Sequence, residues 1–162
     1  MIARNWNNFR TKFEGKERDS FEWFCYNLFC RQFNKGFGVF RYKNQSAIEH
    51  NPIEVNGEQI AWQAKFYDAP LSSHKKDLKD TLEKCNKYYP NLRKLYIYSN
   101  KEWGQNNKGE DPSVKVEIEN QAENYNIEII WYLDSYFQSP FVTVENEDCK
   151  KRKHLNTDSE NT

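Results

Sequence analysis

The residues best suited to chemistry lie in a short, mostly apolar segment, QIAWQAKFY, residues 59–67. Gln63 and Lys65 are two positions apart there, and in a β-strand residues at that spacing point to the same face. An amide oxygen can bind a hard cation, and an ammonium group stabilises negative charge on a phosphate. The alternative interpretation is a strand with one solvated face, which places polar residues at the same spacing. The elements around the segment bear on this choice.

The segment follows an Asn-Gly pair at 56–57, which is typical of a tight hairpin turn. Before that pair, residues 47–55 alternate apolar and polar side chains, and residues 37–44 are rich in aromatic and β-branched types. These patterns predict three short antiparallel strands.

A helix is predicted before these strands, over residues 18–36, with Asp19 or Ser20 as its N-cap and Gly36 just past its end. Its apolar face consists of Phe21, Phe24, Cys25, Leu28 and Phe29. Aromatic residues spaced three and four apart at 6–13 predict a short helix or arm upstream.

A second long helix is predicted over residues 72–89, with Ser72 or Ser73 as its cap and Pro90 as its stop. Its apolar face consists of Leu78, Leu82, Cys85 and Tyr89, and its other face is rich in lysine.

The remaining pattern alternates strand, helix and strand, at 92–100, 111–125 and 127–133. Asp111 would cap this helix and Pro112 would occupy its first position. Strands separated by a helix usually pair in parallel through a right-handed crossover. The expected fold class is therefore α/β, with a mixed central sheet flanked by helices.

The composition indicates one domain of 162 residues, with aromatic residues at 16% and therefore an aromatic-rich core. We predict that residues 1-140 form this domain and that 141-162 form a polar tail or linker, which we expect to be disordered. Lys+Arg and Asp+Glu both number 24, so a local basic patch would have to hold any nucleic acid. The four cysteines lack paired spacing and no apolar run approaches the ~20 residues of a membrane span, so we expect reduced thiols in the cytoplasm.

In this setting the sequence resembles the PD-(D/E)xK, or restriction-endonuclease-like, nucleases, and in particular the Mrr-like branch with QxK. The core of that superfamily has the order αβββαβ, with an acid on the second strand and [DEQ]xK on the third. Glu49 in AIEHNP, with Gln63 and Lys65 in WQAKFY, matches these positions. Glu22 in FEWF matches a helix carboxylate that many members carry. The resemblance covers roughly residues 15 to 135 and implies a metal-dependent endonuclease.

The resemblance also implies a role for each residue. Glu49, the side-chain oxygen of Gln63 and the backbone carbonyl of Ala64 would bind Mg²⁺ or Mn²⁺. Glu22 would assist, directly or through water. Lys65 would stabilise the attacking hydroxide and the charge that develops on the phosphate. Because Gln63 brings no charge, we expect weaker metal binding that depends more on phosphate oxygens of the bound nucleic acid.

The hairpin tests this assignment, because residues on one face of a hairpin must pair across it. A three-residue loop over 55–57, with its glycine in a left-handed bulge, pairs Glu54 with Glu58 and places Glu49 opposite Gln63. The nuclease interpretation predicts this bulged form or an equivalent one-residue shift nearby.

A plain two-residue turn at Asn56-Gly57 has the other consequence. It leaves His50 opposite Gln63 and turns Glu49 to the opposite face. The polar neighbours of the site would then be His50 and Glu54.

Nucleic-acid contacts are expected near the start of the second long helix. Lys75 and Lys76, with Ser72 and Ser73 beside them, are the best phosphate-binding candidates, because they lie near a helix N-terminus. Trp103, in the long polar loop after the next strand, could stack on a nucleic acid or simply belong to a surface loop.

We therefore expect a Mg²⁺- or Mn²⁺-dependent endonuclease that acts on double-stranded DNA in the cytoplasm, away from any membrane. The resemblance suggests a bacterial antiphage effector that is joined to a C-terminal STAND/NACHT-type NTPase or sensor region. A homodimer or higher homo-oligomer would present the two sites that double-strand cleavage needs. Two alternatives stay open: a catalytically inactive nucleic-acid-binding module of the same fold, and a protein-interaction or scaffold domain.

Overall fold

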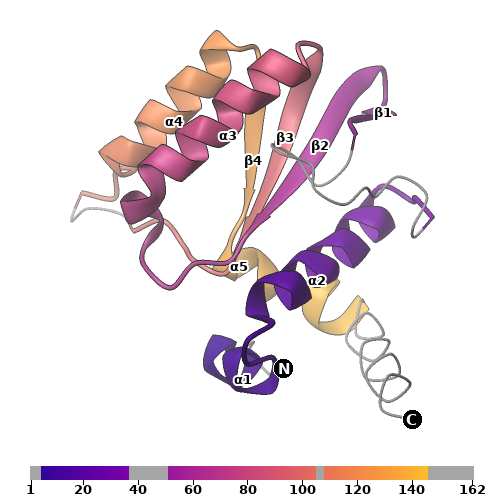
Figure 1. The fold of residues 1–162 in the computed structure, drawn as a ribbon, viewed down its shortest axis with the longest axis vertical. Coiled ribbons are helices and arrows are strands. Elements are labelled where there is room, and N and C mark those ends of the chain that lie inside the picture. Colours follow the sequence, from indigo (N-terminus) through magenta and orange to yellow (C-terminus); the bar gives the residue numbers. More distant parts are fainter. Residues whose placement is uncertain (1–4, 37–50, 105–107, 146–162) are drawn as a thin grey trace.

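A four-stranded mixed sheet in the order β1-β2-β3-β4 forms the centre of this α/β fold (Figure 1). The computed structural model describes residues 5–36, 51–104 and 108–145. The strands are β1 (Ile53–Val55), β2 (Glu58–Lys65), β3 (Leu92–Ser99) and β4 (Glu128–Tyr132). β1 is antiparallel to β2, whereas β2, β3 and β4 are parallel to one another. The parallel pairing confirms the expectation for strands separated by helices.

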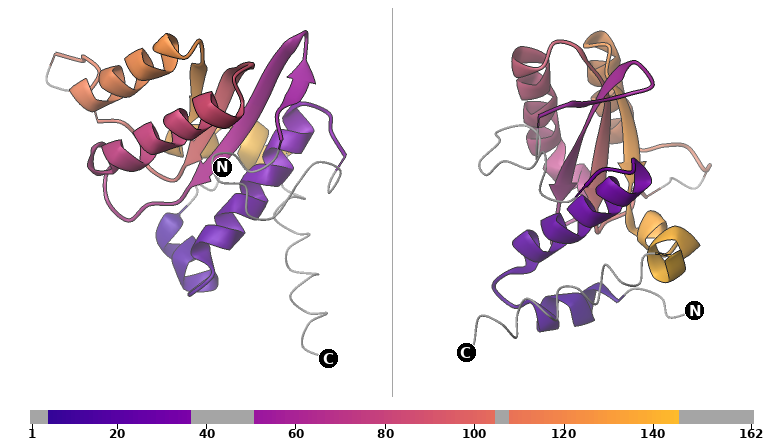
Figure 2. Two further views of the ribbon diagram at one scale, coloured as in Figure 1. Left: turned by 45° about the horizontal axis from the view of Figure 1, so that its top comes forward. Right: turned by 90° about the vertical axis from the view of Figure 1, so that its right-hand side faces the viewer.

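Helices cover both faces of this sheet (Figures 1 and 2). The helices are α1 (Trp6–Lys12), α2 (Glu17–Gln32), α3 (Lys75–Tyr88), α4 (Ser113–Asn124) and α5 (Asp134–Phe137). A 3₁₀ turn, Leu71–His74, precedes α3, and a π-helical turn, Phe141–Glu145, follows α5. α2 lies over one face of the sheet, and α3 and α4 lie together over the other.

Side-chain alternation along the strands gives the two faces different cores. The face under α2 is mostly aromatic and includes Phe21, Phe24, Tyr26, Phe29, Trp62, Tyr98 and Phe137. The face under α3 and α4 is mostly aliphatic and includes Ala61, Leu78, Leu82, Leu95, Ile97 and Ile118. The predicted apolar face of α2 is buried throughout, as expected.

The hairpin between β1 and β2 has a two-residue turn. Val55 pairs with Glu58, and both Asn56 (φ 51°) and Gly57 (φ 80°) have left-handed backbone conformations. Asn-Gly suits this turn because both residues tolerate positive φ. The predicted bulged loop at this turn is therefore wrong. Any equivalent shift further along the hairpin would lie beyond the pair of Ile53 with Ile60, where the described β1–β2 pairing ends.

The ends of α2 differ from the predicted ones. The helix begins at Glu17, a turn earlier than a cap at Asp19 or Ser20 would allow. It ends with Asn34 at φ 53° and a bond from the Lys35 N–H to the Cys30 carbonyl of 2.8 Å. This arrangement is the Schellman motif, in which asparagine takes the position where glycine was expected.

The starts of α3 and α4 also differ from the predicted ones. Ser72 and Ser73 belong to the 3₁₀ turn, so neither of them caps α3. Pro112 is the N-cap of α4, and Asp111 instead accepts a hydrogen bond from Lys115 at 2.9 Å. An acidic residue next to a helix start can therefore pair along the helix surface instead of capping it.

Several predictions fall outside the described residues: the strand at 37–44, residues 47–50 of the strand at 47–55, and Cys149. Val142, which the sequence assigns to the polar tail, is fully buried in the aromatic core. Cys25, Cys30 and Cys85 are buried and form no disulfide with one another. Burial raises the pKa of Cys85 to about 12, although the charge of Lys65 acts in the opposite direction. No helix in the described ranges is long and apolar enough to cross a membrane.

Candidate functional site

Gln63 and Lys65 lie on the same face of β2, as predicted. They alternate with Trp62 and Ala64, which pack into the aromatic core on the α2 side. In the parallel pairing with β3, Lys65 is opposite the buried Ser99. The Lys65 side chain is only 13% exposed. The face is therefore covered by α3, and it is not the solvated face of the alternative interpretation.

The Lys65 ammonium is held by a carboxylate from α3. Lys65 Nζ lies 3.1 Å from Asp77 Oδ2, and the Tyr67 hydroxyl donates to the same oxygen at 2.5 Å. A lysine on a covered face requires such a partner, because an unpaired charge out of water is costly. Asp77 is itself 49% exposed, so the pair lies at the boundary between the core and solvent.

The charges of the cluster perturb two pKa values. Partial burial alone would raise the pKa of Asp77, but the Tyr67 hydrogen bond, the Lys65 charge and His74 together hold it below its usual value. Burial, followed by the bond to Asp77, raises the pKa of Tyr67 far above its usual range, and Arg18 acts weakly in the opposite direction. Asp77 is therefore a carboxylate and Tyr67 a neutral donor at neutral pH.

Tyr67 is fixed from two sides. Its backbone N–H donates to Asn100 Oδ1 at 2.8 Å, and Asn100 Nδ2 donates to its carbonyl at 2.9 Å. Asn100 directly follows β3 and is 3% exposed. The Tyr67 ring stacks on His74, with ring centres 3.7 Å apart. The hydroxyl that orients Asp77 is thereby held in place.

The N-terminal helices reach the same end of β2. Arg10 of α1 donates to Asp68 at 2.5 Å and to the Tyr67 carbonyl at 3.2 Å. Phe21 of α2 contacts Phe66, with ring centres 5.3 Å apart. Glu22, the next residue, is therefore near the end of β2, but it belongs to the helix on the other face of the sheet.

The described residues bring together only part of the predicted metal site. Glu49 and His50 lie outside the described ranges. Glu54 shares the face of Gln63 but pairs with Gln59. Gln59 is four residues before Gln63 on β2, so Glu54 lies about 13 Å along the strand from Gln63. Across the described ranges, no three histidine, cysteine or acidic side chains are grouped to hold a metal ion. Gln63 and the Ala64 carbonyl would need acidic ligands from elsewhere to bind Mg²⁺.

The predicted phosphate-binding residues lie at the start of α3. Ser72 and Ser73 are exposed. Lys75 pairs with Glu117 of α4 at 2.5 Å, and Lys76 pairs with Asp80 at 3.0 Å. Both lysines are partly neutralised by these pairs, so a phosphate would have to compete with a carboxylate at each position.

Trp103 does not stand out from its loop as a free stacking surface. Its ring packs edge-on against Trp131 of β4, with ring centres 5.4 Å apart. Both rings pack against the small buried cluster formed by Tyr67, Leu71 and Leu133.

Three residues of the observed cluster were missed by the sequence argument: Tyr67, Asp77 and Asn100. A usable signal was present for two of them, since Tyr67 and Asn100 follow the ends of neighbouring parallel strands. The carboxyl ends of parallel strands commonly carry functional residues in α/β proteins. Asp77 gave no such signal, because its charge sits in a helix that alternates lysine and acidic residues.

A scan against protein-family models finds no match to this chain, and a search of curated proteins finds no relative of it. Function must therefore be inferred from the fold and the geometry of the site.

Proposed function

We propose that this domain is a metal-dependent endonuclease of the PD-(D/E)xK type, with a restriction-endonuclease-like core of the Mrr-like branch. One observation carries the proposal: Lys65 is held on a covered face of β2, beside Gln63 and at the carboxyl end of the parallel strands. Lysine is seldom buried, so a nearly buried lysine at the carboxyl end of parallel strands is a candidate functional group. The order of helices and strands in the described chain is compatible with such a core.

In this proposal, Lys65 stabilises negative charge on the scissile phosphate of double-stranded DNA. Asp77 orients the ammonium, and Tyr67 orients Asp77. Gln63 and the Ala64 carbonyl would hold Mg²⁺ or Mn²⁺, which supplies a polarised phosphate and an activated water when bound. Glu49 would join them only through a one-residue shift beyond the observed β1–β2 pairs, because the two-residue turn otherwise places it on the opposite face. Glu22 of α2 would assist from the end of β2, directly or through water. Lys75, Lys76, Ser72 and Ser73 would contact the DNA backbone.

The decisive experiment is a cleavage assay on plasmid and linear DNA with Mg²⁺ or Mn²⁺, with chelator as the blank. We expect Lys65→Ala to lower the rate by about 100-fold or more, since it removes a charge aimed at the reacting phosphate. Lys94→Ala is the matched control, because Lys94 is a strand lysine paired with Glu58 at 3.2 Å, away from Lys65. Cleavage that survives in Lys65→Ala rules out the proposed role of this lysine.

A catalytically inactive nucleic-acid-binding module is the second candidate. It is favoured by the neutral Gln63 and by the pairing of the Lys65 ammonium with Asp77. This candidate predicts DNA binding without cleavage under every metal condition. A domain that neither binds nor cuts DNA would instead be the protein-interaction or scaffold domain.

By analogy with the proteins that the sequence resembles, we further propose a cytoplasmic defence effector. A homodimer or higher homo-oligomer would supply two sites for the two DNA strands. A C-terminal NTPase or sensor region would supply the activating signal. These proposals rest on analogy of fold and not on the site.

A further inference from the structure

β4 is an edge strand of the sheet and, within the described part of the chain, pairs with β3 alone. Its sequence, EIIWY, contains no lysine or proline. Those two residues are common on strand edges that must resist pairing with another chain. The edge of β4 is therefore suited to accept an additional strand.

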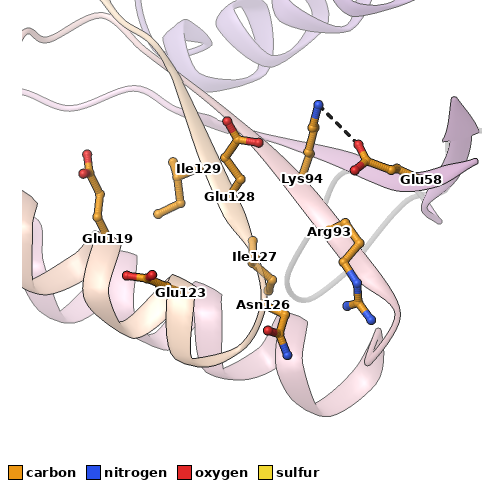
Figure 3. Close-up of a pocket in the computed structure, with 9 residues that line it drawn as sticks. All are labelled: Glu58, Arg93, Lys94, Glu119, Glu123, Asn126, Ile127, Glu128 and Ile129. Atoms are coloured by element: carbon orange, nitrogen blue, oxygen red, sulfur yellow. Dashed lines mark ion pairs between the residues drawn. The ribbon is translucent and has the colours of Figure 1, made fainter. Parts of the chain in front are cut away.

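Two hollows flank β4, one near each end. The first has a volume of about 600 Å³ and lies where β4 begins (Figure 3). Its charged lining consists of Glu58, Glu119, Glu123, Glu128, Arg93 and Lys94. The second has a volume of about 480 Å³ and lies where β4 ends, with Glu102, Asp111 and Lys115 as its charged lining.

Both hollows are acidic. Six carboxylates and three cations line them together, which gives a net charge of −3. Lys94 is neutralised by Glu58 at 3.2 Å, and Lys115 by Asp111 at 2.9 Å. Glu123 and Glu128 are exposed and form no ion pair with other described residues. The unneutralised charge around β4 is therefore negative.

The second hollow has an aromatic wall of Trp103 and Trp131 that is held in place. The Trp131 indole N–H donates to Glu119 Oε1 at 2.9 Å, and Glu119 also lines the first hollow. Trp103 packs edge-on against Trp131 and lines the second hollow. The faces of tryptophan rings attract guanidinium and ammonium groups. Fixed rings and carboxylates together provide a preformed site for cationic side chains.

We propose that the β4 edge docks an extended basic peptide of a partner protein, which adds to the sheet as a further strand. Its backbone would pair with β4, and its lysine or arginine side chains would enter the two acidic hollows. Alternate side chains of an added strand point to one face, so basic residues at every second position would face Glu119 and Glu123 on the α4 side, whereas Glu128 points to the α2 side. The net negative charge disfavours nucleic acid at this edge. This inference does not depend on the proposed nuclease activity.

The test is NMR titration of the ¹⁵N-labelled domain with a synthetic peptide of alternating arginine and valine. A peptide with glutamate in place of every arginine is the negative control. We expect the basic peptide to shift the amide signals of Glu128–Tyr132, and we expect the acidic peptide to leave them unchanged. Added salt should weaken the binding, since part of it is electrostatic.

The double variant Glu119→Gln/Glu123→Gln should weaken binding about fivefold, because two charge pairs are lost while the acceptor for Trp131 is retained. Glu83→Gln, at an exposed position of α3, is the control and should bind the peptide normally. The proposal is overturned if β4 does not respond, if the acidic peptide binds equally well, if the double variant is unaffected, or if a DNA duplex shifts the same amides.

Discussion

The two faces of the sheet are built from different chemistry. On the α2 face, Trp62 contacts Tyr26 and Phe29, with ring centres 6.2 and 6.0 Å away. On the other face, the same strand carries Ala61 in an aliphatic core and ends at Lys65, whose ammonium is paired with Asp77. The alternation of one strand thus separates apolar packing from a charged cluster.

This difference implies a division of work. Aromatic rings bury large apolar areas, so the α2 face should dominate the free energy of unfolding. The cluster around Lys65 depends on directional bonds whose partners come from β2, α3 and the residue after β3. Substitutions on the two faces should therefore differ both in size and in what they disturb.

The largest effect should come from the centre of the aromatic face. Trp62→Ala is expected to lower the free energy of unfolding by about 3–5 kcal/mol, because it leaves a cavity where a fully buried ring was packed. Urea denaturation measures this loss. Tyr88→Ala is the control, since Tyr88 is 54% exposed and should cost well under half as much. Equal costs at the two positions would contradict the division between the faces.

Asn100→Ala should produce the next largest effect, at the polar end of the other face. The substitution leaves the Tyr67 N–H without its buried acceptor and removes one donor from the Tyr67 carbonyl, which costs about 2–3 kcal/mol. The exposed Asn91→Ala, just before β3, should change stability very little. A cost below about 0.5 kcal/mol for Asn100→Ala would mean that water replaces both bonds.

The regular spacing of apolar residues explains why much of the fold could be predicted from the sequence. The buried side of α2 and the strands β3 and β4 follow directly from apolar spacing, because burial imposes that period on the sequence. The hairpin did not follow, since an Asn-Gly pair is compatible with both a two-residue turn and a bulged loop. The pairing of Val55 with Glu58 had to be observed.

Of the candidate site, the sequence predicted only the arrangement of residues within β2. The shared face of Gln63 and Lys65 follows from strand geometry alone. The partner of Lys65 does not, because α3 carries several acidic residues and its register over the sheet selects Asp77. Likewise, the hydrogen bonds between Asn100 and Tyr67 join residues 33 positions apart, and local sequence patterns do not predict contacts at that separation.

Asp77→Asn should have a smaller effect that depends on pH. The folded-state pKa of Asp77 lies below its usual value of 3.8, so its charge stabilises the fold above that pH. That contribution is lost as the pH falls through the lower folded-state value. Since Asp77 is half exposed, the cost at about pH 7 should be no more than about 1 kcal/mol. Thermal unfolding of both proteins from about pH 2 to 7 should show the difference shrinking toward acid.

Arg10→Ala should have the smallest effect, although Arg10 joins α1 to the same end of β2. Its pair with Asp68 is largely exposed, so its loss should cost about 0.5 kcal/mol. Comparing unfolding at low salt and in about 1 M NaCl separates the two contributions of this side chain. Salt screens the ion pair, but it leaves the packing of the guanidinium over the Phe66 ring at 5.0 Å and its bond to the Tyr67 carbonyl at 3.2 Å. A cost that persists in high salt would therefore assign the contribution of Arg10 to these two short-range contacts, and a cost that disappears would assign it to the ion pair with Asp68.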